Sequence, residues 1–368
     1  MKKNLVIVLF CLTTMLVGCK NKVDSVINIA FNMPITGDLG YMGEEVQSGL
    51  TLALEDYSDT ISRYGYKIVV DFQDNKGQVK DAVTIFNMQK SHKPDLYMSG
   101  VLPQVMAIKE MVKKEGVPHH IWAFSPLYLN REDDMFRTWL NLGIEADQYV
   151  KVITSRNAKK VAYIYVNIQG CQEQCEEVVI PKVKELSPDC EITPLPYPSE
   201  STDLKNIVLK AKQLNPDLII INGFKNQMIS LIRSLKSNKM IGDRNVVGSF
   251  DLLDAAPELS ADELENITMS VPVFMTLNST DEYLAWKEKF YAKYNRYPEH
   301  TDAYAYDYGR MLVEAIRIMK ENDITLREAL FKVSIEGITG PLHFMENGEL
   351  NVPIVQCSFK NHKLIPDN

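Results

Sequence analysis

The chain has 368 residues, which exceeds the ~100–200 residues of one typical domain and predicts two globular lobes. It carries 40 Lys and Arg against 48 Asp and Glu, a formal net charge of −8, and its basic residues are scattered. We therefore expect no nucleic-acid partner, because phosphate backbones are bound by basic patches.

The first twenty residues have the composition of a secretory signal. Two lysines precede an apolar stretch from Leu5 to Val17, which is shorter than the ~20 residues of a membrane-spanning helix. We predict a signal peptide over residues 1–18 and a polar tether over residues 19–26. The ending Leu16-Val17-Gly18-Cys19 resembles the bacterial lipobox, in which the cysteine becomes lipidated. An ordinary signal with an incidental cysteine is the alternative.

From Ile27 the chain alternates between apolar strands and amphipathic helices. The first helix places Val46, Leu50, Ala53 and Tyr57 on one stripe. Repeated units of this kind predict a parallel sheet with helices on both faces. Strands are expected at 27–33, 66–74, 95–100 and 118–124, and helices at 44–57, 79–90 and 102–116.

A second series of the same design follows and predicts a second α/β lobe. Its helices are expected at 145–157, 172–188, 203–217 and 226–239, with Pro181 interrupting the second one, and its strands at 159–167, 190–198, 218–223 and 244–250. The remaining chain predicts helices at 280–295, 301–323 and 326–333. Two final strands, 340–345 and 353–359, are joined by a turn with Asn347-Gly348, which is typical of a hairpin.

Four cysteines remain after the predicted cleavage site: Cys171, Cys175, Cys190 and Cys357. Cys171 and Cys175 are candidates for a local disulfide, with free thiols as the alternative. A metal site is not expected, because a single CxxxC lacks a second ligand pair. His119 and His120 are neighbours on a predicted strand and point to opposite faces.

Three glycines, Gly37, Gly40 and Gly43, lie between the first strand and the first helix. A dinucleotide-binding turn requires G-x-G-x-x-G, whereas the spacing in this loop is G-x-x-G-x-x-G. We therefore expect no nucleotide cofactor. The free amides of the helix N-terminus could still attract a carboxylate or another acceptor.

Five segments resemble the leucine/isoleucine/valine-binding type of periplasmic solute-binding protein (type I), which serves ABC importers. In chain order they are NMPITGDLGYMGEEVQSGLTLALED, KEGVPHHIWAFSP, MFRTWLNLGIEADQYVKVI, DAYAYDYGRMLVEAIR and TGPLHFMENGEL. The resemblance implies two doubly wound parallel-sheet lobes, joined by three crossings and closing by hinge bending around a ligand cleft. We expect lobe I at 27–142 plus 277–336 and lobe II at 143–276 plus 337–366. The crossings are expected near Asn141–Gly143, Pro272–Thr276 and Glu336–Thr339.

The resemblance also implies cleft residues in lobe I. They follow three strands and are Tyr41, Met42, Leu102, Pro103, Gln104, Trp122, Ala123, Phe124 and Ser125. Leu102 stands where the family often has a carboxylate-binding serine, and Ala123 and Ser125 stand where it supplies a carbonyl and a hydroxyl. As an alternative, Trp122 or Phe124 could be a core residue, because neighbours on a strand face opposite sides.

In lobe II the resemblance implies that Phe224 covers the ligand and that Asp251 pairs with its ammonium group. A shift of one residue would place Phe250 at the acidic position. The tyrosine that the family has near Gly170 is absent. These departures favour a larger or more aromatic ligand than a simple branched-chain amino acid. Asp251 could alternatively cap the helix that follows it.

The resemblance implies a non-enzymatic, extracytoplasmic protein, anchored to a bacterial membrane by lipid alone. It would capture an amino acid, a derivative or a short peptide for an ABC transporter permease. A ligand-sensing receptor of the same fold is the alternative. An exported enzyme has less support, because G-x-S-x-G and H-E-x-x-H motifs are absent, and His119 or His120 could act as a base only beside a nucleophile. We expect a monomer with no cofactor and no metal.

Overall fold

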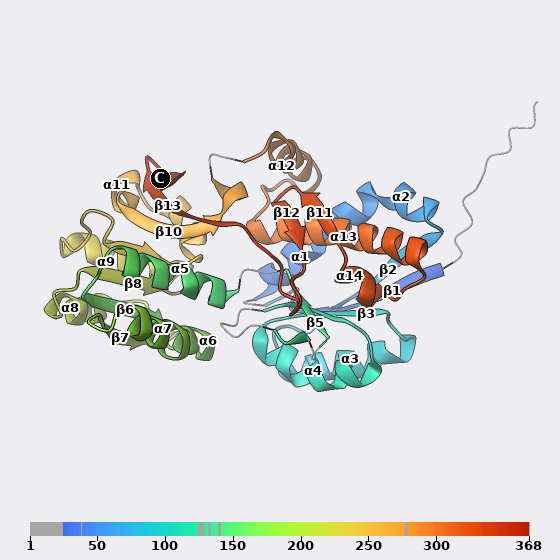
Figure 1. Ribbon diagram of the computed structural model, residues 1–368, viewed down its shortest axis with the longest axis horizontal. Coiled ribbons are helices and arrows are strands. Elements are labelled where there is room, and N and C mark those ends of the chain that lie inside the picture. Colours follow the sequence, from blue (N-terminus) through green and yellow to red (C-terminus); the bar gives the residue numbers. More distant parts are fainter. Residues whose placement is uncertain are drawn as a thin grey trace, which may run out of the picture.

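The computed structural model describes residues 25–37, 39–123, 129–131, 134–138, 141–276 and 279–367. The predicted signal peptide, Cys19, Phe124 and Ser125 lie outside these ranges. Two lobes stand side by side, each with its own sheet and its own helices (Figure 1). The predicted fold class, two α/β lobes with mainly parallel sheets, is confirmed.

The first lobe contains a five-stranded parallel sheet of order β2-β1-β3-β4-β5. Its strands are β1 (Ser25–Met33), β2 (Tyr66–Asp74), β3 (Leu96–Gly100), β4 (His119–Trp122) and β5 (Met135–Arg137). Its helices are α1 (Gly40–Asp56), α2 (Ser58–Arg63), α3 (Val79–Gln89), α4 (Leu102–Glu115), α12 (Asp281–Tyr294), α13 (His300–Asn322) and α14 (Leu326–Leu330), with a 3-10 turn η1 (Lys90–His92). Because β1 begins at Ser25, it takes in the last two residues of the predicted tether.

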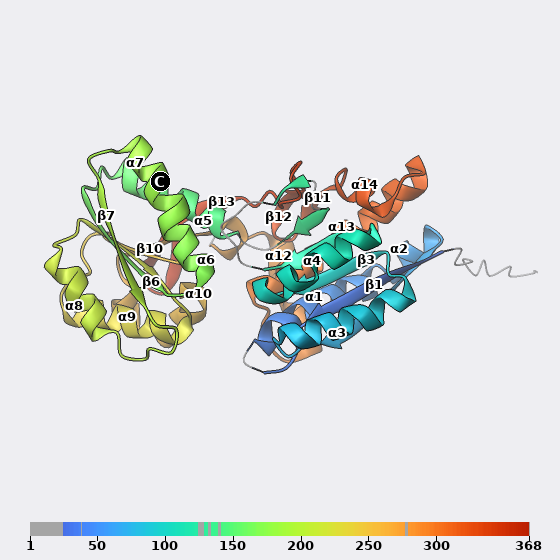
Figure 2. The ribbon, with the colours of Figure 1, turned by 90° about the horizontal axis from the view of Figure 1, so that it is seen from below.

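The alternation along β1 sets the layers of this lobe. Ile29, Phe31 and Met33 point to one face and share a buried apolar cluster with α1 and α13. Ala30 points to the other face and packs in a separate cluster with α3 and α4. Figure 2 shows α3 and α4 lying together over the strands. The sheet is therefore covered by helices on both faces, as its apolar strands predict.

The second lobe contains a seven-stranded sheet of order β14-β13-β10-β9-β8-β6-β7. Its strands are β6 (Lys160–Val166), β7 (Glu191–Tyr197), β8 (Leu218–Asn222), β9 (Val246–Gly248), β10 (Ile267–Pro272), β13 (Ile354–Lys360) and β14 (Lys363–Pro366). Strand β13 is antiparallel to both β10 and β14, and the other pairs are parallel. One continuous apolar cluster fills this lobe.

Helices surround the second sheet, with α5 to α7 and α8 to α9 on opposite sides of the strands (Figure 2). They are α5 (Leu142–Ser155), α6 (Gln169–Gln172), α7 (Ile180–Leu186), α8 (Lys205–Gln213), α9 (Lys225–Ser237), α10 (Leu252–Ala255) and α11 (Ala261–Leu264). The 3-10 turns η4 (Ala256–Glu258) and η5 (Val273–Met275) complete the set. Between α6 and α7 the chain forms a π-helical segment, η3 (Glu173–Val179), directly before Pro181, whose missing N–H interrupts the regular helix as predicted.

The predicted hairpin between residues 340–345 and 353–359 is wrong. Strand β12 (Gly340–His343) pairs with β11 (Ser334–Gly337) instead, while β13 joins the second sheet. The Asn347-Gly348 turn does form, with Gly348 at φ 91° and a bridge between Phe344 and Leu350. The local turn signal was therefore correct, but the strand after it pairs in the other lobe.

The third crossing also lies later than expected. Ile338, Leu342, Phe344 and Val352 belong to the apolar cluster of the first lobe, so the chain passes to the second lobe after Val352 rather than near Glu336–Thr339. The expected boundary at residue 337 is therefore too early.

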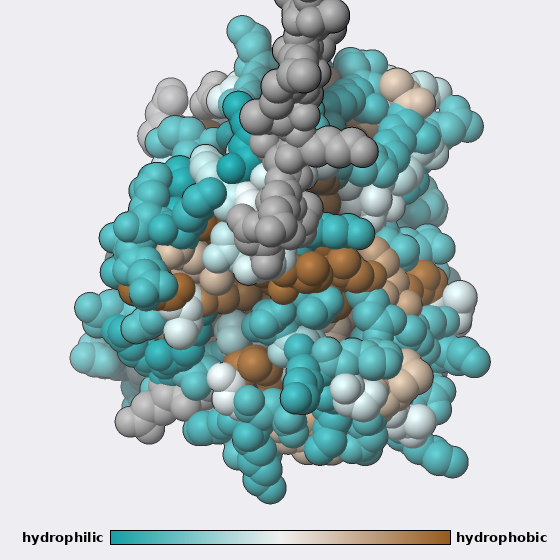
Figure 3. All heavy atoms as spheres, turned by 90° about the vertical axis from the view of Figure 1, so that its right-hand side faces the viewer, coloured by the Kyte–Doolittle hydropathy of each residue, from teal (hydrophilic) through white to brown (hydrophobic). Residues whose placement is uncertain are grey.

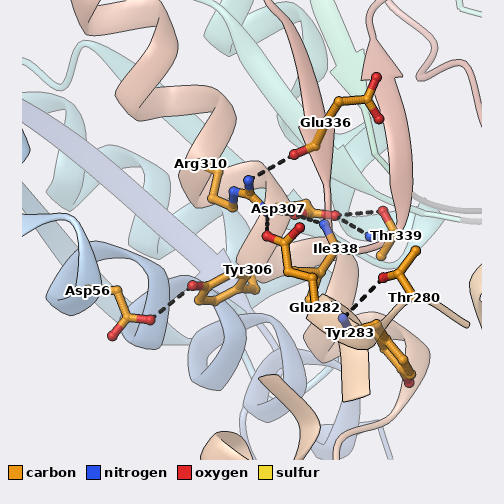
Figure 4. Close-up of polar contacts among 10 residues, drawn as sticks. All are labelled: Asp56, Thr280, Glu282, Tyr283, Tyr306, Asp307, Arg310, Glu336, Ile338 and Thr339. Carbon is orange, nitrogen blue, oxygen red and sulfur yellow. Dashed lines mark hydrogen bonds and ion pairs between the residues drawn. The ribbon is translucent and has the colours of Figure 1, made fainter. Parts of the chain in front are cut away.

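A polar cluster on α13 fixes residues 336–339 to the first lobe (Figure 4). The buried Asp307 carboxylate accepts the N–H groups of Ile338 (2.9 Å) and Thr339 (2.8 Å) and the Thr339 hydroxyl (2.6 Å). Arg310, one turn further along α13, donates to the Glu336 carbonyl (2.8 Å) and to the Glu282 carboxylate of α12 (3.0 Å). These contacts connect the DAYAYDYGR segment to the chain near Gly337.

The far end of the first lobe carries a band of apolar residues between polar ones (Figure 3). A shallow groove at this end is lined by Leu54 and Ser58 of the first two helices and by Ile68, Val70 and Phe72 of the edge strand β2. Among the residues that the structure describes, no helix combines the length and the apolar character needed to span a bilayer.

Candidate functional site

The carboxyl ends of strands from both sheets supply the residues that lie between the lobes. Strands β1 and β3 lead into α1 and α4 in the first lobe, and β8 and β9 lead into α9 and α10 in the second. Parallel α/β sheets bind ligands at these strand ends. The two sides come close together: a carboxylate oxygen of Asp254 on α10 lies within 4.8 Å of a Glu299 oxygen and a His300 ring nitrogen at the start of α13.

Asp251 occupies the centre of this region. It follows β9 and occupies the N-cap position of α10 without a capping hydrogen bond from its side chain, and Ser249 Oγ donates to its carboxylate at 3.2 Å. The pKa of Asp251 is raised to about 7, mainly by burial and also by the neighbouring carboxyls of Glu145 and Asp254. A carboxyl in this environment gains from a positively charged partner, because such a partner offsets both effects.

Tyr41 of the first lobe lies close enough to Asp251 for the two groups to interact electrostatically. It lies in the first turn of α1 with 49% of its surface exposed. Partial burial raises the pKa of the Tyr41 phenol, and the carboxyls of Asp251 and Asp254 add to the shift. Tyr41 therefore lies near the acidic turn of the second lobe.

Glu45, one turn further along α1, makes the first lobe acidic at the same place. Its pKa is raised to about 8, mainly by burial and also by the carboxyls of Asp302, Glu299 and Asp254. Because Asp254 belongs to the second lobe, carboxyls from both lobes act on each other across the gap. The site as a whole is therefore suited to a ligand with positive charge.

The Asp254, Glu299 and His300 group could also hold a cation, since its three ligand atoms lie within 4.8 Å of one another. Lys225 of α9 already supplies positive charge there. Its ammonium group pairs with Glu258 at 2.7 Å, and its pKa is raised mainly by that hydrogen bond, with smaller contributions from Asp254 and Glu299. The sequence did not predict this group, because its members are distant along the chain.

Phe224 lies just after β8, at the N-cap position of α9, with 43% of its surface exposed. Beside it, a Cβ on Gly223 would lie 1.9 Å from the Tyr197 hydroxyl, so Gly223 packs closely against Tyr197. The Tyr197 hydroxyl donates to the Asn222 carbonyl at 2.9 Å, and its pKa is raised by burial, by Cys171 and by Asp251. Tyr197 thus lies beside Asp251, although the sequence did not single it out.

The start of α4 presents two of the expected residues at the surface: Leu102 is half-buried and Pro103 is exposed. Val101 precedes them with φ 64°, a conformation that a β-branched residue rarely adopts. Hydrogen bonds hold it there: its N–H donates to the Trp122 carbonyl, and its carbonyl accepts from Gln104 and Val105. Strain maintained in this way is common at binding sites.

Four of the expected cleft residues have structural roles. Met42 and Trp122 are buried in the apolar cluster of the first lobe, with exposures of 4% and 0%. Gln104 is buried and donates to the Gly77 carbonyl. The Ala123 carbonyl already accepts from Arg137 Nη1 at 3.2 Å. For Met42 and Trp122, packing explains the residue type better than ligand contact.

The proposed disulfide does not form in the structure, where Cys171 and Cys175 are buried free thiols. The other described cysteines are also free, with Cys190 half-buried and Cys357 buried. The Cys171 thiol lies 3.3 Å from Asn222 Oδ1, and burial and the nearby Asp251 raise its pKa. A buried thiol with a raised pKa is a poor nucleophile.

Ser99 and His119 form a pair with 2.7 Å between Oγ and Nε2. Both are buried between β3 and β4, and burial lowers the pKa of His119 to about 3. His120 bonds Thr138 Oγ1 at 2.9 Å and stacks on Tyr308 at 3.7 Å between ring centroids. Both histidines therefore have partners within the core of the first lobe.

The residues that sequence reasoning missed are Glu45, Glu145, Tyr197, Asp254, Glu299 and His300. Two signals could have found some of them: Glu45 lies one helical turn beyond Tyr41, and Asp254 one turn beyond Asp251. Tyr197 and His300 come close to Asp251 and Asp254 only through the fold.

Comparisons with known proteins agree with the resemblance that the sequence motifs indicate. A family model described as periplasmic binding protein matches residues 26–359. An ABC transporter substrate-binding protein from Sphaerobacter thermophilus has a similar structure, with a TM-score of 0.78 and 19% identity over 93% of this chain and 98% of that chain. No curated protein matches the sequence significantly.

Two further solved structures contain ligands. The branched-chain amino acid transporter substrate-binding protein LivJ from Streptococcus pneumoniae, in complex with isoleucine, has a TM-score of 0.74 and 20% identity over 92% of this chain and 97% of that chain. A solute-binding protein of an ABC transporter from R. palustris, in complex with benzoate, has a TM-score of 0.75 and 15% identity over 93% of this chain and 95% of that chain.

Proposed function

Since the chain belongs to the periplasmic binding protein family, we propose that it is an extracytoplasmic solute-binding lipoprotein of an ABC importer. It captures an amino acid, an amino-acid derivative or a short peptide between its lobes. The ligand carries a positively charged amino group, which Asp251 binds, and the closed, loaded protein is the form that the permease accepts.

The observation that carries this proposal is the position of Asp251. It lies at the carboxyl end of β9, beside Tyr197 of its own lobe, and its carboxyl acts on Tyr41 of the opposite lobe. A carboxyl that interacts with groups of both lobes can couple ligand binding to closure. The bound ligand gains contacts with the opposite lobe only when the two lobes meet.

The ligand differs from a simple branched-chain amino acid. The first lobe has Leu102 where a serine would hold a carboxylate, and the Ala123 carbonyl already accepts a hydrogen bond from Arg137. The exposed rings of Phe224 and Tyr41 add apolar surface near the acidic turn. These features favour a ligand with an amino group and an apolar or aromatic body.

The protein acts as a monomer that holds one ligand and is tied to the membrane through Cys19. Support for the anchor comes from the lipobox-like sequence, and β1 begins six residues after Cys19, at Ser25. A short link of this kind keeps the cleft close to a membrane-embedded permease.

A thermal-shift screen tests the function. Amino acids, derivatives and short peptides are compared with benzoate and ATP at equal concentration. A true ligand at ~100 times its dissociation constant adds ~2.7 kcal/mol to the free energy of unfolding, which gives a clear rise in melting temperature. We expect stabilisation within the first three classes. Stabilisation by ATP or benzoate alone would contradict the proposed ligand class.

A further inference from the structure

A second carboxyl lies behind Asp251. Glu145, in the first turn of α5, is only 2% exposed. Its Oε1 accepts the backbone N–H of Phe250 at 2.7 Å, and its Oε2 accepts Gln174 Nε2 at 2.8 Å. Because Phe250 is the residue before Asp251, Glu145 holds the peptide that leads into the proposed ligand-binding carboxyl.

Gln174 in turn has a fixed orientation. Its Oε1 accepts the Tyr163 hydroxyl of β6 and the Asn222 amide of β8, both at 2.9 Å, and its Nε2 also donates to the Leu142 carbonyl at 2.9 Å. Two strands and one helix therefore determine where Glu145 Oε2 lies. A chain of buried hydrogen bonds of this kind costs free energy to disturb, so it keeps one arrangement.

The side chain of Phe250 packs against the first lobe. Its side chain is 5% exposed and belongs to the apolar cluster of the first lobe, although its backbone belongs to the second. The turn that Glu145 holds thus has one side chain packed across the lobe boundary and the next, Asp251, in the polar gap.

We infer that Glu145 is a positioning residue for ligand recognition: it fixes the Phe250–Asp251 turn and stands behind the Asp251 carboxyl, so that this half of the site takes a positively charged group. The inference rests on the proposed function for the identity of the site. The hydrogen bonds that place Glu145 are independent of it.

The electrostatics support the inference. The titratable and charged groups that face Asp251 or its neighbour Asp254 come from both lobes, and they are Tyr41, Glu45, Glu145, Tyr149, Cys171, Tyr197, Lys225, Glu299 and His300. Burial raises the pKa of Glu145 itself to about 7. Two buried carboxyls that repel each other favour a cation between or beside them and disfavour a carboxylate ligand.

Carboxyl-carbon NMR titration of the unliganded protein tests the role of Glu145, with the Asp251 signal assigned from its loss in Asp251→Asn. We expect Asp251 to titrate near neutral pH in the wild type and about one pH unit lower in Glu145→Gln, which keeps the side-chain length and an acceptor for Phe250. Asp262→Asn, on exposed α11 of the same lobe, is the control and should leave Asp251 unchanged. An Asp251 midpoint that is the same in Glu145→Gln and wild type would overturn the inference.

If Glu145→Gln does not fold, titration of Glu145 in Asp251→Asn tests the same interaction. Coupling between two titrating groups is symmetric, so Asp251→Asn should lower the midpoint of Glu145 by a similar amount. No change in that midpoint would equally overturn the inference.

Matched ligand pairs test the charge preference. Thermal shifts are measured with L-leucine against 2-hydroxyisocaproate and with putrescine against 1,4-butanediol. We expect stabilisation only by amines, and less of it in Glu145→Gln at neutral pH because the turn is less well held. Equal stabilisation by a hydroxy compound would overturn the inference. If no compound of the pairs or of the wider screen binds, the proposed function fails, while the titration still decides the role of Glu145.

Discussion

At the scale of single residues, the buried pair of Arg137 and Glu349 joins two segments that are far apart in sequence. Arg137 Nε donates to Glu349 Oε2 at 2.8 Å, and the Leu129 N–H and the Asn141 amide also donate to this carboxylate, at 2.8 and 3.1 Å. Both charged side chains are at most 1% exposed. Glu349 therefore connects the end of the first sheet to the beginning of the crossing into the second lobe.

Glu349→Gln should lower the free energy of unfolding by about 3 kcal/mol, because it leaves the Arg137 charge buried without its partner. Urea denaturation measures this. Asp189→Asn, which breaks the exposed pair with Lys159 at 3.9 Å, is the matched control and should cost less than about 1 kcal/mol. Equal losses in the two variants would show that the buried pair adds no special stability.

Glu45 makes stability depend on pH in a defined direction. Its pKa is raised to about 8 in the folded protein, from about 4.3 in an unfolded chain, so the folded state keeps a proton that the unfolded state has lost. The stability is fully present below pH 4 and is lost as the pH rises through 8. Relative to Glu45→Gln, the wild type should lose about 1–3 kcal/mol between pH 5 and pH 8, after allowance for solvent screening.

Denaturation of wild type and Glu45→Gln at each pH separates the contribution of Glu45 to stability from that of the buried histidines. The lowered pKa values of these histidines change stability with pH in the opposite direction. A constant difference between wild type and Glu45→Gln over this range would contradict the raised pKa.

At the scale of elements, α13 and the chain around Gly337 form one unit. A Cβ on Gly337 would lie 2.4 Å from Asp307 Oδ2 and 2.8 Å from Leu342 Cδ1. Asp307 cannot move aside without losing its hydrogen bonds to Ile338 and Thr339.

Gly337→Ala should therefore cost about 1–3 kcal/mol in urea denaturation, as overpacking does in a well-filled core. Gly242→Ala is the control, since its nearest neighbour would be 3.5 Å away, and it should change stability by less than about 0.5 kcal/mol. A Gly337→Ala variant as stable as the control would show that Asp307 can rearrange freely.

Elements whose residues alternate or repeat locally could be predicted from the sequence, as β1, α4 and α9 show. Features that depend on distant partners could not. The turn at Asn347-Gly348 was recognised, but nothing in residues 353–359 indicates that β13 pairs with β10 of the second sheet rather than with the strand before the turn. The short strands β5, β11 and β14 have three or four residues each, too few for a periodic pattern.

The candidate site shows the same division. Asp251, Tyr41 and Phe224 follow strand ends and could be named from the order of elements. Met42 and Trp122 could not be separated from core residues by sequence, because burial on a helix or strand depends on which face meets the next layer. Glu145 was invisible as a site residue, since it meets Phe250 only after two elements 105 residues apart pack together.

At the scale of the whole molecule, the proposed lipid anchor at Cys19 would hold the two lobes at the membrane surface. Cys19→Ala should abolish labelling by a radioactive fatty acid and release the protein from the membrane fraction, because a cysteine thiol is needed for lipidation. The folded lobes should be unaffected, which circular dichroism checks. Membrane retention of Cys19→Ala equal to that of the wild type would contradict the anchor.

The central claim is that the protein captures a positively charged small molecule between its lobes through Asp251. Calorimetric titration with the amine that stabilises it most in the thermal-shift screen tests this most directly, on wild type, Asp251→Asn and the control Asp262→Asn. We predict that Asp251→Asn lowers the affinity at least tenfold, about 1.4 kcal/mol, while the control binds like the wild type. Equal affinities in all three proteins would contradict the account.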